Sequence, residues 1–266
     1  MRLWQRRGRN WDKAELLKIL PAEGGLAFSL AFSPVGASLP SGIGKLIAAG
    51  YGDGKVRLWT TDGTLHNTLT GQEEMVSCVA FSPDGQFIAS SGNLNQIKVW
   101  HRDGRLLTTL AENDASVNDV AFSPDGQLVA SCSGDSTIKL WNYNSTTGVS
   151  SQSIKTFVGH NGVVSKIAWS SNGQFFASCG MDTTVKLWSR EGELITTLLG
   201  HSGSVWNVAV APDGSFLASV GEDNTLVVWN LPRILKLDLL EYGCNWVRDY
   251  LRTSAEVEEG DRQLCQ

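Results

Sequence analysis

Five stretches of this chain end in the same kind of tetrapeptide, in which three apolar or basic residues precede a tryptophan. They read VRLW, IKVW, IKLW, VKLW and LVVW and close at Trp59, Trp100, Trp141, Trp188 and Trp229. Subtracting successive positions gives spacings of 41, 41, 47 and 41 residues. A nearly fixed period of this length indicates one repeated supersecondary unit whose copies must share a core.

Each unit reads as a four-stranded antiparallel meander. One unit contains a strand, a Ser-Pro-Asp-Gly turn, a second strand, a second turn and a third strand, at 117–122, 123–126, 127–131, 134–136 and 137–141. Proline presets φ for such a turn, glycine accepts a positive φ, and the third segment is rich in β-branched and aromatic residues. A further polar turn and a short outer strand, such as 106–110, complete the regular units.

A single meander of this kind has two apolar faces, so it cannot bury its core alone and must stack on its neighbours. Radial stacking leaves only short strand edges open. The sequence therefore predicts an all-β fold, a β-propeller of five four-stranded antiparallel blades over residues 14–232.

The repeat resembles the WD-repeat family of β-propellers over residues 14–230. In that family each blade carries a structural tetrad, formed by a His before the inner strand, a Ser or Thr in the second strand, an Asp in the following turn and the Trp of the third strand. Two units contain all four residues: His160, Ser178, Asp182 and Trp188, and His201, Ser219, Asp223 and Trp229. The resemblance implies that these residues hold their blades together.

The other three units keep only part of the tetrad. The residues kept are Asp53 and Trp59 in the first unit, Ser90 and Trp100 in the second, and Ser131, Asp135 and Trp141 in the third. The replacements are Glu23 and Ala49, Gln72 and Leu94, and Asn113, respectively. Buried polar links hold strands together only when they are fully satisfied, so the first two blades are expected to be less rigid.

Ser, His and Asp are also the residue types of a nucleophilic triad. The structural role is favoured, because the trio recurs in two units, each with a Trp whose indole N–H needs a buried acceptor. The chain also lacks a Gly-x-Ser-x-Gly turn of the kind that exposes a catalytic serine. The sequence therefore predicts no catalytic residue.

Two glycine-rich stretches, 41–45 and 50–55, could suggest a phosphate-binding loop. The first has Leu39 and Leu46 where such a loop needs Gly and Ser or Thr, and is better interpreted as an eight-residue expansion of the first hairpin. The second lies at a tetrad turn and opens no helix. The four His show no ligand spacing, so we expect neither a metal nor another cofactor.

The five cysteines, at 78, 132, 179, 244 and 265, form no Cys-x-x-Cys pair. Cys132 and Cys179 hold equivalent second-strand positions, where small buried hydrophobic residues are expected. This usage suits a reducing compartment. The net charge of −5 argues against a nucleic-acid partner, and the sequence has neither a bilayer-spanning run nor a signal-peptide hydrophobic region. We therefore expect a cytoplasmic protein without a membrane partner.

The two ends of the chain bear on ring closure. Residues 1–13 are basic and contain Arg2-Leu3-Trp4, which resembles the end of a third strand, so the chain would start inside a blade, and residues 14–20 read as the outer strand that follows. The fifth unit shows no regular outer strand of its own. Either residues 14–20 supply that strand and close a five-bladed ring, or the chain is the tail of a longer array and the ring stays open.

The last segment, 233–266, breaks the repeat and ends in an acidic tail. Within 236–253, apolar residues fall along one helical stripe: Leu239, Leu240, Trp246, Val247, Tyr250 and Leu251. We expect this helix to cover the last blade, and the alternative is a docking helix for a partner. The segment resembles tails that follow propellers in bacterial, especially cyanobacterial, WD-repeat proteins, some of which carry upstream NTPase or protease modules that are absent here.

The fold and the absence of a reactive site favour a noncatalytic scaffold or sensor that binds a protein or peptide of unidentified kind. The resemblance places binding on the narrow face of the propeller, at Ser77, Asn118, Ser165 and Trp206 near the inner-strand starts, and at Asn93, Met181 and Glu222 beside the tetrad turns. Trp206 is the first candidate anchor, with packing against a neighbouring blade as its alternative. The insert around 143–153 is a further candidate, with a plain loop as its alternative.

A different function is a regulatory end of a multidomain NTPase or protease system, with self-association or a complementing chain completing an open ring. An autonomous hydrolase is the least favoured function.

Overall fold

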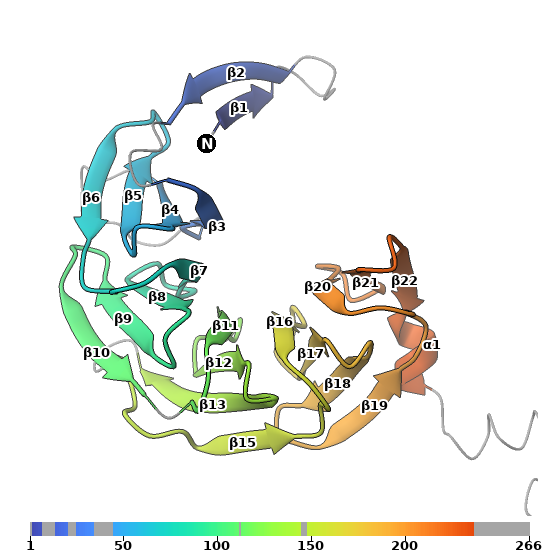
Figure 1. The fold of residues 1–266 in the computed structure, drawn as a ribbon. Coiled ribbons are helices and arrows are strands. Elements are labelled where there is room, and N and C mark those ends of the chain that lie inside the picture. Colours follow the sequence, from blue (N-terminus) through green and yellow to red (C-terminus); the bar gives the residue numbers. More distant parts are fainter. Residues whose placement is uncertain are drawn as a thin grey trace, which may run out of the picture.

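The computed structural model describes residues 2–6, 14–20, 25–34, 45–111, 113–144 and 148–236 of the chain. Antiparallel sheets follow one another along an open arc, with the inner strands toward its centre and the outer strands on its rim (Figure 1). The prediction of an all-β fold built from five blades is confirmed.

In each blade the strands follow the chain outward from the inner strand, and blade 5 has three strands among the described residues. Blade 1 contains β3 (Ala27–Phe32), β4 (Leu46–Tyr51), β5 (Val56–Thr60) and β6 (Leu65–Leu69), and blade 2 contains β7 (Val76–Phe81), β8 (Phe87–Gly92), β9 (Ile97–His101) and β10 (Leu106–Leu110). Blade 3 contains β11 (Val117–Phe122), β12 (Leu128–Ser133), β13 (Thr137–Asn144), β14 (Gly148–Val149) and β15 (Lys155–Val158). Blade 4 contains β16 (Val164–Trp169), β17 (Phe175–Gly180), β18 (Val185–Ser189) and β19 (Leu194–Leu198), and blade 5 contains β20 (Val205–Val210), β21 (Phe216–Gly221) and β22 (Leu226–Asn230).

In blades 2 and 3 the hairpin between the first two strands is set by a Ser-Pro-Asp-Gly sequence, at 82–85 and 123–126. In blade 3 the Ser123 N–H donates to the Leu128 carbonyl at 2.9 Å, and the Leu128 N–H donates to Ser123 Oγ at 2.9 Å. Asp125 accepts from the Gln127 N–H, and Gly126 takes a φ of 66°, which glycine adopts at little steric cost. This local chemistry fixes the register of the two inner strands.

The core lies between blades and repeats from one interface to the next. We call the side of a blade that meets the next blade its forward face, and the opposite side its rear face. Between blades 1 and 2, the forward face contributes Leu46, Ala48, Val56, Leu58 and Leu69, and the rear face contributes Val76, Val79, Phe81, Ile88 and Trp100. Buried apolar area of this kind stabilises roughly 25 cal/mol per Å², so stacking supplies the stability that an isolated sheet lacks.

The insert in blade 3 contains a short strand. β13 extends past Trp141, and Tyr143 pairs with Val149 of β14. Both side chains are buried, and the Tyr143 ring makes edge-to-face contacts with Phe87 and Phe122. The interpretation of this insert as a plain loop was therefore wrong for its ends, because Tyr143 packs in the core and pairs with β14. Residues 145–147 lie outside the described part of the chain.

The alternative of a ring closed by residues 14–20 is wrong for this structure. β2 (Ala14–Ile19) pairs with β1 (Arg2–Arg6), and Figure 1 shows this two-stranded sheet at the opposite end of the arc from β22. Leu20 is buried with Ile47 and Trp59 of blade 1, which is the contact an outer strand makes with the rear face of the next blade. β1 and β2 thus form the third and outer strands of a half blade.

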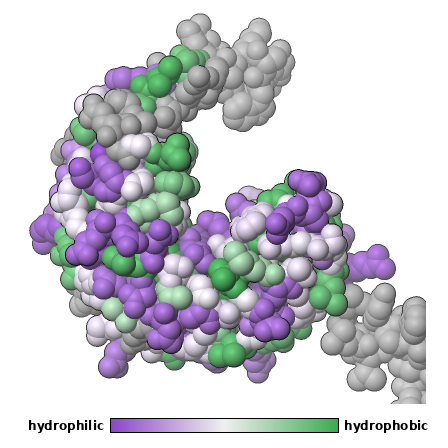
Figure 2. All heavy atoms as spheres, in the orientation of Figure 1, coloured by the Kyte–Doolittle hydropathy of each residue, from purple (hydrophilic) through white to green (hydrophobic). Residues whose placement is uncertain are grey.

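The two ends of the arc expose apolar faces. On the rear face of blade 1, Leu30 and Phe32 are exposed, Phe32 to 66%. On the forward face of blade 5, Phe216, Leu226 and Val228 are exposed, Leu226 to 64%. Figure 2 shows hydrophobic side chains at the inner edge of the arc beside the opening.

A short helix, α1 (Leu231–Lys236), follows β22 and packs Leu231 and Ile234 into the core between blades 4 and 5. The predicted helix at 236–253 lies outside the described residues beyond Lys236. No helix in the described part of the chain is long and apolar enough to cross a membrane.

Candidate functional site

The structure brings together the tetrad residues of blades 4 and 5. In blade 4, His160 Nδ1 lies 2.8 Å from Asp182 Oδ2, His160 Nε2 lies 2.6 Å from Ser178 Oγ, and Trp188 Nε1 donates to the same oxygen at 2.8 Å. In blade 5 the corresponding distances for His201, Asp223, Ser219 and Trp229 are 2.9, 2.8 and 2.9 Å. These bonds link the third strand, the second strand and the loop before the inner strand.

The charge state of the blade 4 tetrad follows from its burial. Burial lowers the pKa of His160, and the Asp182 carboxylate opposes this shift. The neutral ring then donates from Nδ1 to Asp182 and accepts at Nε2 from the Ser178 hydroxyl. Burial tends to raise the pKa of Asp182, but the Asn161 N–H, His160 and Thr184 together hold it below its usual range.

Ser178 Oγ is enclosed and fully engaged. The residue is buried, its hydroxyl bonds His160, and its lone pair accepts from the Trp188 indole. A nucleophilic serine needs an approach path and an adjacent oxyanion-binding pocket. This geometry supports the structural reading of the trio over the triad reading.

The incomplete tetrads leave buried polar atoms unpaired. In blade 2, Trp100 Nε1 donates to Ser90 Oγ at 2.9 Å, while Gln72 Oε1 has no partner among the described residues. In blade 1, Asp53 pairs with Arg57 instead, at 2.8 Å, and Arg57 lies over the Tyr51 ring. The tetrad aspartate of blade 1 is therefore paired with a residue of the third strand, β5.

Blade 3 has the largest defect. Asn113, at the His position, is buried, and both polar atoms of its amide are unpaired within the described part of the chain. Ser131 Oγ and Trp141 Nε1 are likewise buried without a partner there. Asp135 is nevertheless in place, since its Oδ2 accepts from the Asp114 N–H at 3.0 Å, as Asp182 accepts from Asn161.

The candidate binding residues near the inner-strand starts share a structural cause. The register shifts by one residue at the start of each inner strand, and the residue at each shift is Ser77, Asn118, Ser165 and Trp206. A bulge of this kind redirects a side chain. Trp206 is 47% exposed, and the other three are half-buried. Asn118 donates to the Val164 carbonyl of the next blade at 2.8 Å, so part of its capacity is used in packing.

The second group of candidates follows the second strands. Asn93, Met181 and Glu222 are exposed beside the tetrad turns, and Ser204 donates to Glu222 Oε2 at 2.9 Å. Both groups therefore lie at the same ends of their blades, near the loops that precede the inner strands.

The sequence reasoning missed Phe28. It occupies the bulge position of β3, where the register shifts between Ala27 and Ser29, and it is exposed. Aligning AFSLAF at 27–32 with VSCVAF at 76–81 places Phe28 opposite Ser77, so the signal was present in the sequence. Blades 1 and 5 thus each present an aromatic side chain at this position.

The described part of the chain contains no group of three or more His, Cys, Asp or Glu side chains able to hold a metal ion. Cys78, Cys132 and Cys179 are free and buried, and burial raises the pKa of all three thiols. The placement expected for Cys132 and Cys179 is confirmed.

Radially stacked meanders tied by buried His-Asp and Ser-Trp links define a propeller-type repeat scaffold. A family model described as WD domain, G-beta repeat matches residues 15–60, 63–101, 104–142, 151–189 and 192–230. These segments make up well over half of the chain, which therefore belongs to the WD40 repeat family. WD40 domains are generally noncatalytic and commonly bind proteins. No curated protein matches the chain.

Proposed function

We propose that this protein is a noncatalytic interaction module that binds a protein or peptide on its narrow face. The observation that carries the proposal is the exposure of Trp206 at the bulge of β20, at the same end of the blades as the exposed Met181 and Glu222 that follow the second strands. A rigid aromatic side chain beside polar groups is the composition typical of binding anchors. The enclosed tetrad serine and the family membership support a noncatalytic role.

The test uses a displayed library of short peptides selected on the wild-type protein. Enriched peptides are then titrated against Trp206→Ala and against Phe216→Ala, a matched control that removes a similarly exposed aromatic from the forward face of the same blade. Truncating a central Trp costs about 2 kcal/mol, so we expect about 30-fold weaker binding to Trp206→Ala. Equal dissociation constants for Trp206→Ala and the wild type would remove Trp206 from the site.

A second candidate function rests on the exposed end faces. The ends of the arc present the same apolar positions as its internal interfaces. Such an arc suits the regulatory or sensor end of a multidomain NTPase or protease system, in which a further chain or a second copy covers the exposed end faces. The same titrations separate the two candidates. A partner that loses affinity for Phe216→Ala but not for Trp206→Ala binds the end face.

A further inference from the structure

One rim position recurs in four blades, two residues after the tryptophan of the third strand. The backbone N–H of the residue at this position donates to the carbonyl of the residue before the second strand of the same blade. The pairs are Arg102 with Gln86 at 2.8 Å, Tyr143 with Gln127 at 2.8 Å, Arg190 with Gln174 at 3.1 Å, and Leu231 with Ser215 at 3.2 Å. The four side chains therefore start from equivalent points on the rim.

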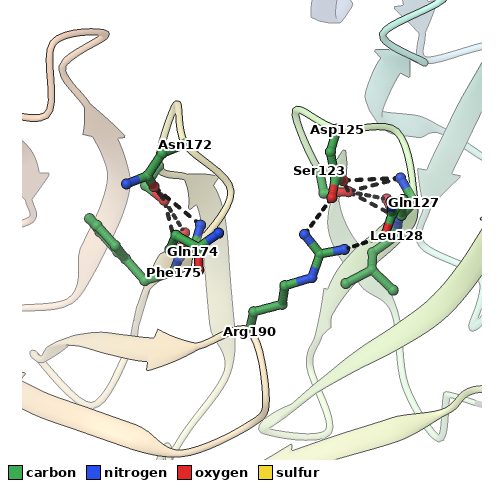
Figure 3. A network of polar contacts seen from close by, with 9 residues as sticks. Ser123, Asp125, Gln127, Leu128, Asn172, Gln174, Phe175 and Arg190 are labelled. Atoms are coloured by element: carbon green, nitrogen blue, oxygen red, sulfur yellow. Dashed lines mark hydrogen bonds and ion pairs between the residues drawn. The ribbon is translucent and has the colours of Figure 1, made fainter.

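Two of these side chains reach the first hairpin of the preceding blade and bind its aspartate. Tyr143 Oη lies 3.1 Å from Asp84 Oδ2 of blade 2. Arg190 Nη1 contacts Asp125 Oδ2 of blade 3, and its Nη2 lies 3.0 Å from Gln127 Oε1 (Figure 3). In blades 3 and 4 the rim position thus carries a polar side chain that is matched to a carboxylate one blade earlier.

Arg102 belongs to blade 2, so the corresponding hairpin of the preceding blade is the first hairpin of blade 1, at residues 33–46. This hairpin contains no acidic residue. Its base is the same as in blade 3, because the Ser33 N–H donates to the Leu46 carbonyl and the Leu46 N–H donates to Ser33 Oγ, both at 2.9 Å. This register places Lys45 where blade 3 has Gln127, the amide that binds Arg190. Lys45 thus puts a cation in place of the neutral amide, and residues 33–46 contain neither Asp nor Glu, so this hairpin has no carboxylate to pair with the rim arginine.

Arg102 is left with unmet hydrogen-bonding capacity. The residue is only 3% exposed, and neither Nη1 nor Nη2 has a hydrogen-bond partner among the described residues. The neighbouring acid, Asp103, is already paired with Arg105 at 2.9 Å and with His101 at 2.8 Å. Burial lowers the pKa of Arg102, but a guanidinium stays charged in a protein. A buried guanidinium without a partner is unfavourable, and a bound anion would remove that cost.

We propose that Arg102 and Lys45 form a binding site for a small oxyanion, a phosphate or a carboxylate, on the rim between blades 1 and 2. The planar fork of Arg can bind either group through two parallel hydrogen bonds. At the equivalent position of blade 4, the two terminal nitrogens of Arg190 bond one oxygen of Asp125 and one of Gln127. The site lies at the other end of the strands from the tetrad turns, so it is independent of the peptide-binding proposal.

The experiment is isothermal titration of the full chain with inorganic phosphate and, in a second series, with acetate. Four proteins are compared: wild type, Arg102→Met, Lys45→Gln and the matched control Arg190→Met. We expect binding to fall at least about tenfold in Arg102→Met and to weaken in Lys45→Gln, because each removes a charge-assisted contact. Arg190→Met should bind like the wild type, since Asp125 already occupies its guanidinium.

The two titration series identify the source of the anion. Tighter binding of phosphate assigns the site to a phosphate group, and equal or tighter binding of acetate assigns it to the carboxylate of an acidic side chain. If circular dichroism shows that Arg102→Met is unfolded, Arg102→Lys and Lys45→Gln are used instead. Arg102→Lys is expected to bind the anion more weakly than the wild type, because an ammonium cannot make the two parallel hydrogen bonds of a guanidinium. Wild-type protein that binds neither anion, or anion binding that is unaffected by every change at Arg102 and Lys45, overturns the proposal.

Discussion

At the residue scale, the tetrad positions show how one side chain decides whether the buried polar atoms of a blade find hydrogen-bond partners. His160 spans the distance between Asp182 and Ser178, and Ser178 in turn accepts from Trp188. Asn113 is shorter than an imidazole, so it bridges neither neighbour, and the atoms around it remain unpaired within the described residues. Each unpaired buried polar group costs about 1–3 kcal/mol.

Asn113→His should therefore stabilise the protein, by about 1–2 kcal/mol, because the new imidazole meets Ser131 on one side and Asp135 on the other. Urea unfolding followed by circular dichroism measures the gain. In a Ser131→Ala background the gain should shrink, since the imidazole Nε2 loses its donor. An equal gain in both backgrounds would show that the effect is unrelated to the tetrad.

The pKa of His160 makes stability depend on pH with a definite sign. Burial holds the folded-state pKa of His160 below its ordinary value of about 6.5, so the unfolded chain binds a proton first as the pH falls. Stability should be constant above this pH and fall below it, until the folded state is protonated as well. The lowered pKa of Asp182 adds a second loss as the pH falls below about 4.

The measurement is the free energy of unfolding between pH 8 and pH 5 for wild type, His160→Gln and His66→Gln, the last being an exposed surface control. We expect the decline on acidification to be smaller in His160→Gln and unchanged in His66→Gln. Identical profiles for the wild type and His160→Gln would contradict the assignment.

At the element scale, the inner strands are tied across blades as well as within them. Asp119 on β11 accepts from Lys166 Nζ at 2.7 Å and from the Ile167 N–H at 2.9 Å, both on β16, and from Cys78 Sγ at 2.8 Å on β7. Burial and the adjacent Asp119 carboxylate raise the pKa of Cys78, so its thiol remains a donor. One carboxylate thus joins three consecutive blades.

Asp119→Ala should destabilise the protein by about 3–5 kcal/mol, because it leaves Lys166 and a buried N–H without their acceptor. Lys166→Met should cost less, since the Lys166 side chain is 35% exposed and Asp119 keeps two other donors. Thermal unfolding of both variants tests the order. A larger loss in Lys166→Met would mean that the lysine, and not the carboxylate, organises the contact.

At the scale of the whole molecule, the end faces of the arc repeat the apolar positions of the internal interfaces. Phe216, Leu226 and Val228 of blade 5 occupy the places of Leu46, Val56 and Leu58 of blade 1, which blade 2 covers. Exposed apolar patches of this kind favour association.

We expect the mass measured by light scattering to rise with protein concentration. Leu226→Lys should reduce this rise, because it places a charge on the forward face of blade 5. Leu106→Lys, on the exposed outer strand of blade 2, is the matched control and should leave it unchanged. A constant monomer mass at all concentrations would show that the end faces do not self-associate.

The sequence by itself determined the blades. The repeat period, the turn residues and the alternation of apolar and polar side chains are properties of short segments. Residues such as Ser123 and Gly126 therefore fix the hairpin of their own blade, independently of where that blade lies. The same regularity carried the resemblance to the WD-repeat family, and that resemblance implied the tetrads. The bulge that exposes Trp206 also recurs, which is why Phe28 could have been found by aligning the units.

The tertiary structure decided what depends on contacts between distant segments. Whether residues 14–20 close the ring or cover blade 1 is settled by the pairing of β2 with β1 and the burial of Leu20 against Ile47 and Trp59, which no local pattern specifies. That Arg102 lacks a partner is likewise recognised only by comparing its rim position with that of Arg190. The carboxylate that pairs with Arg190 is Asp125, which lies on another blade, 65 residues away in sequence. Local chemistry sets strands and turns, but packing between blades sets which polar groups are satisfied and which faces remain open.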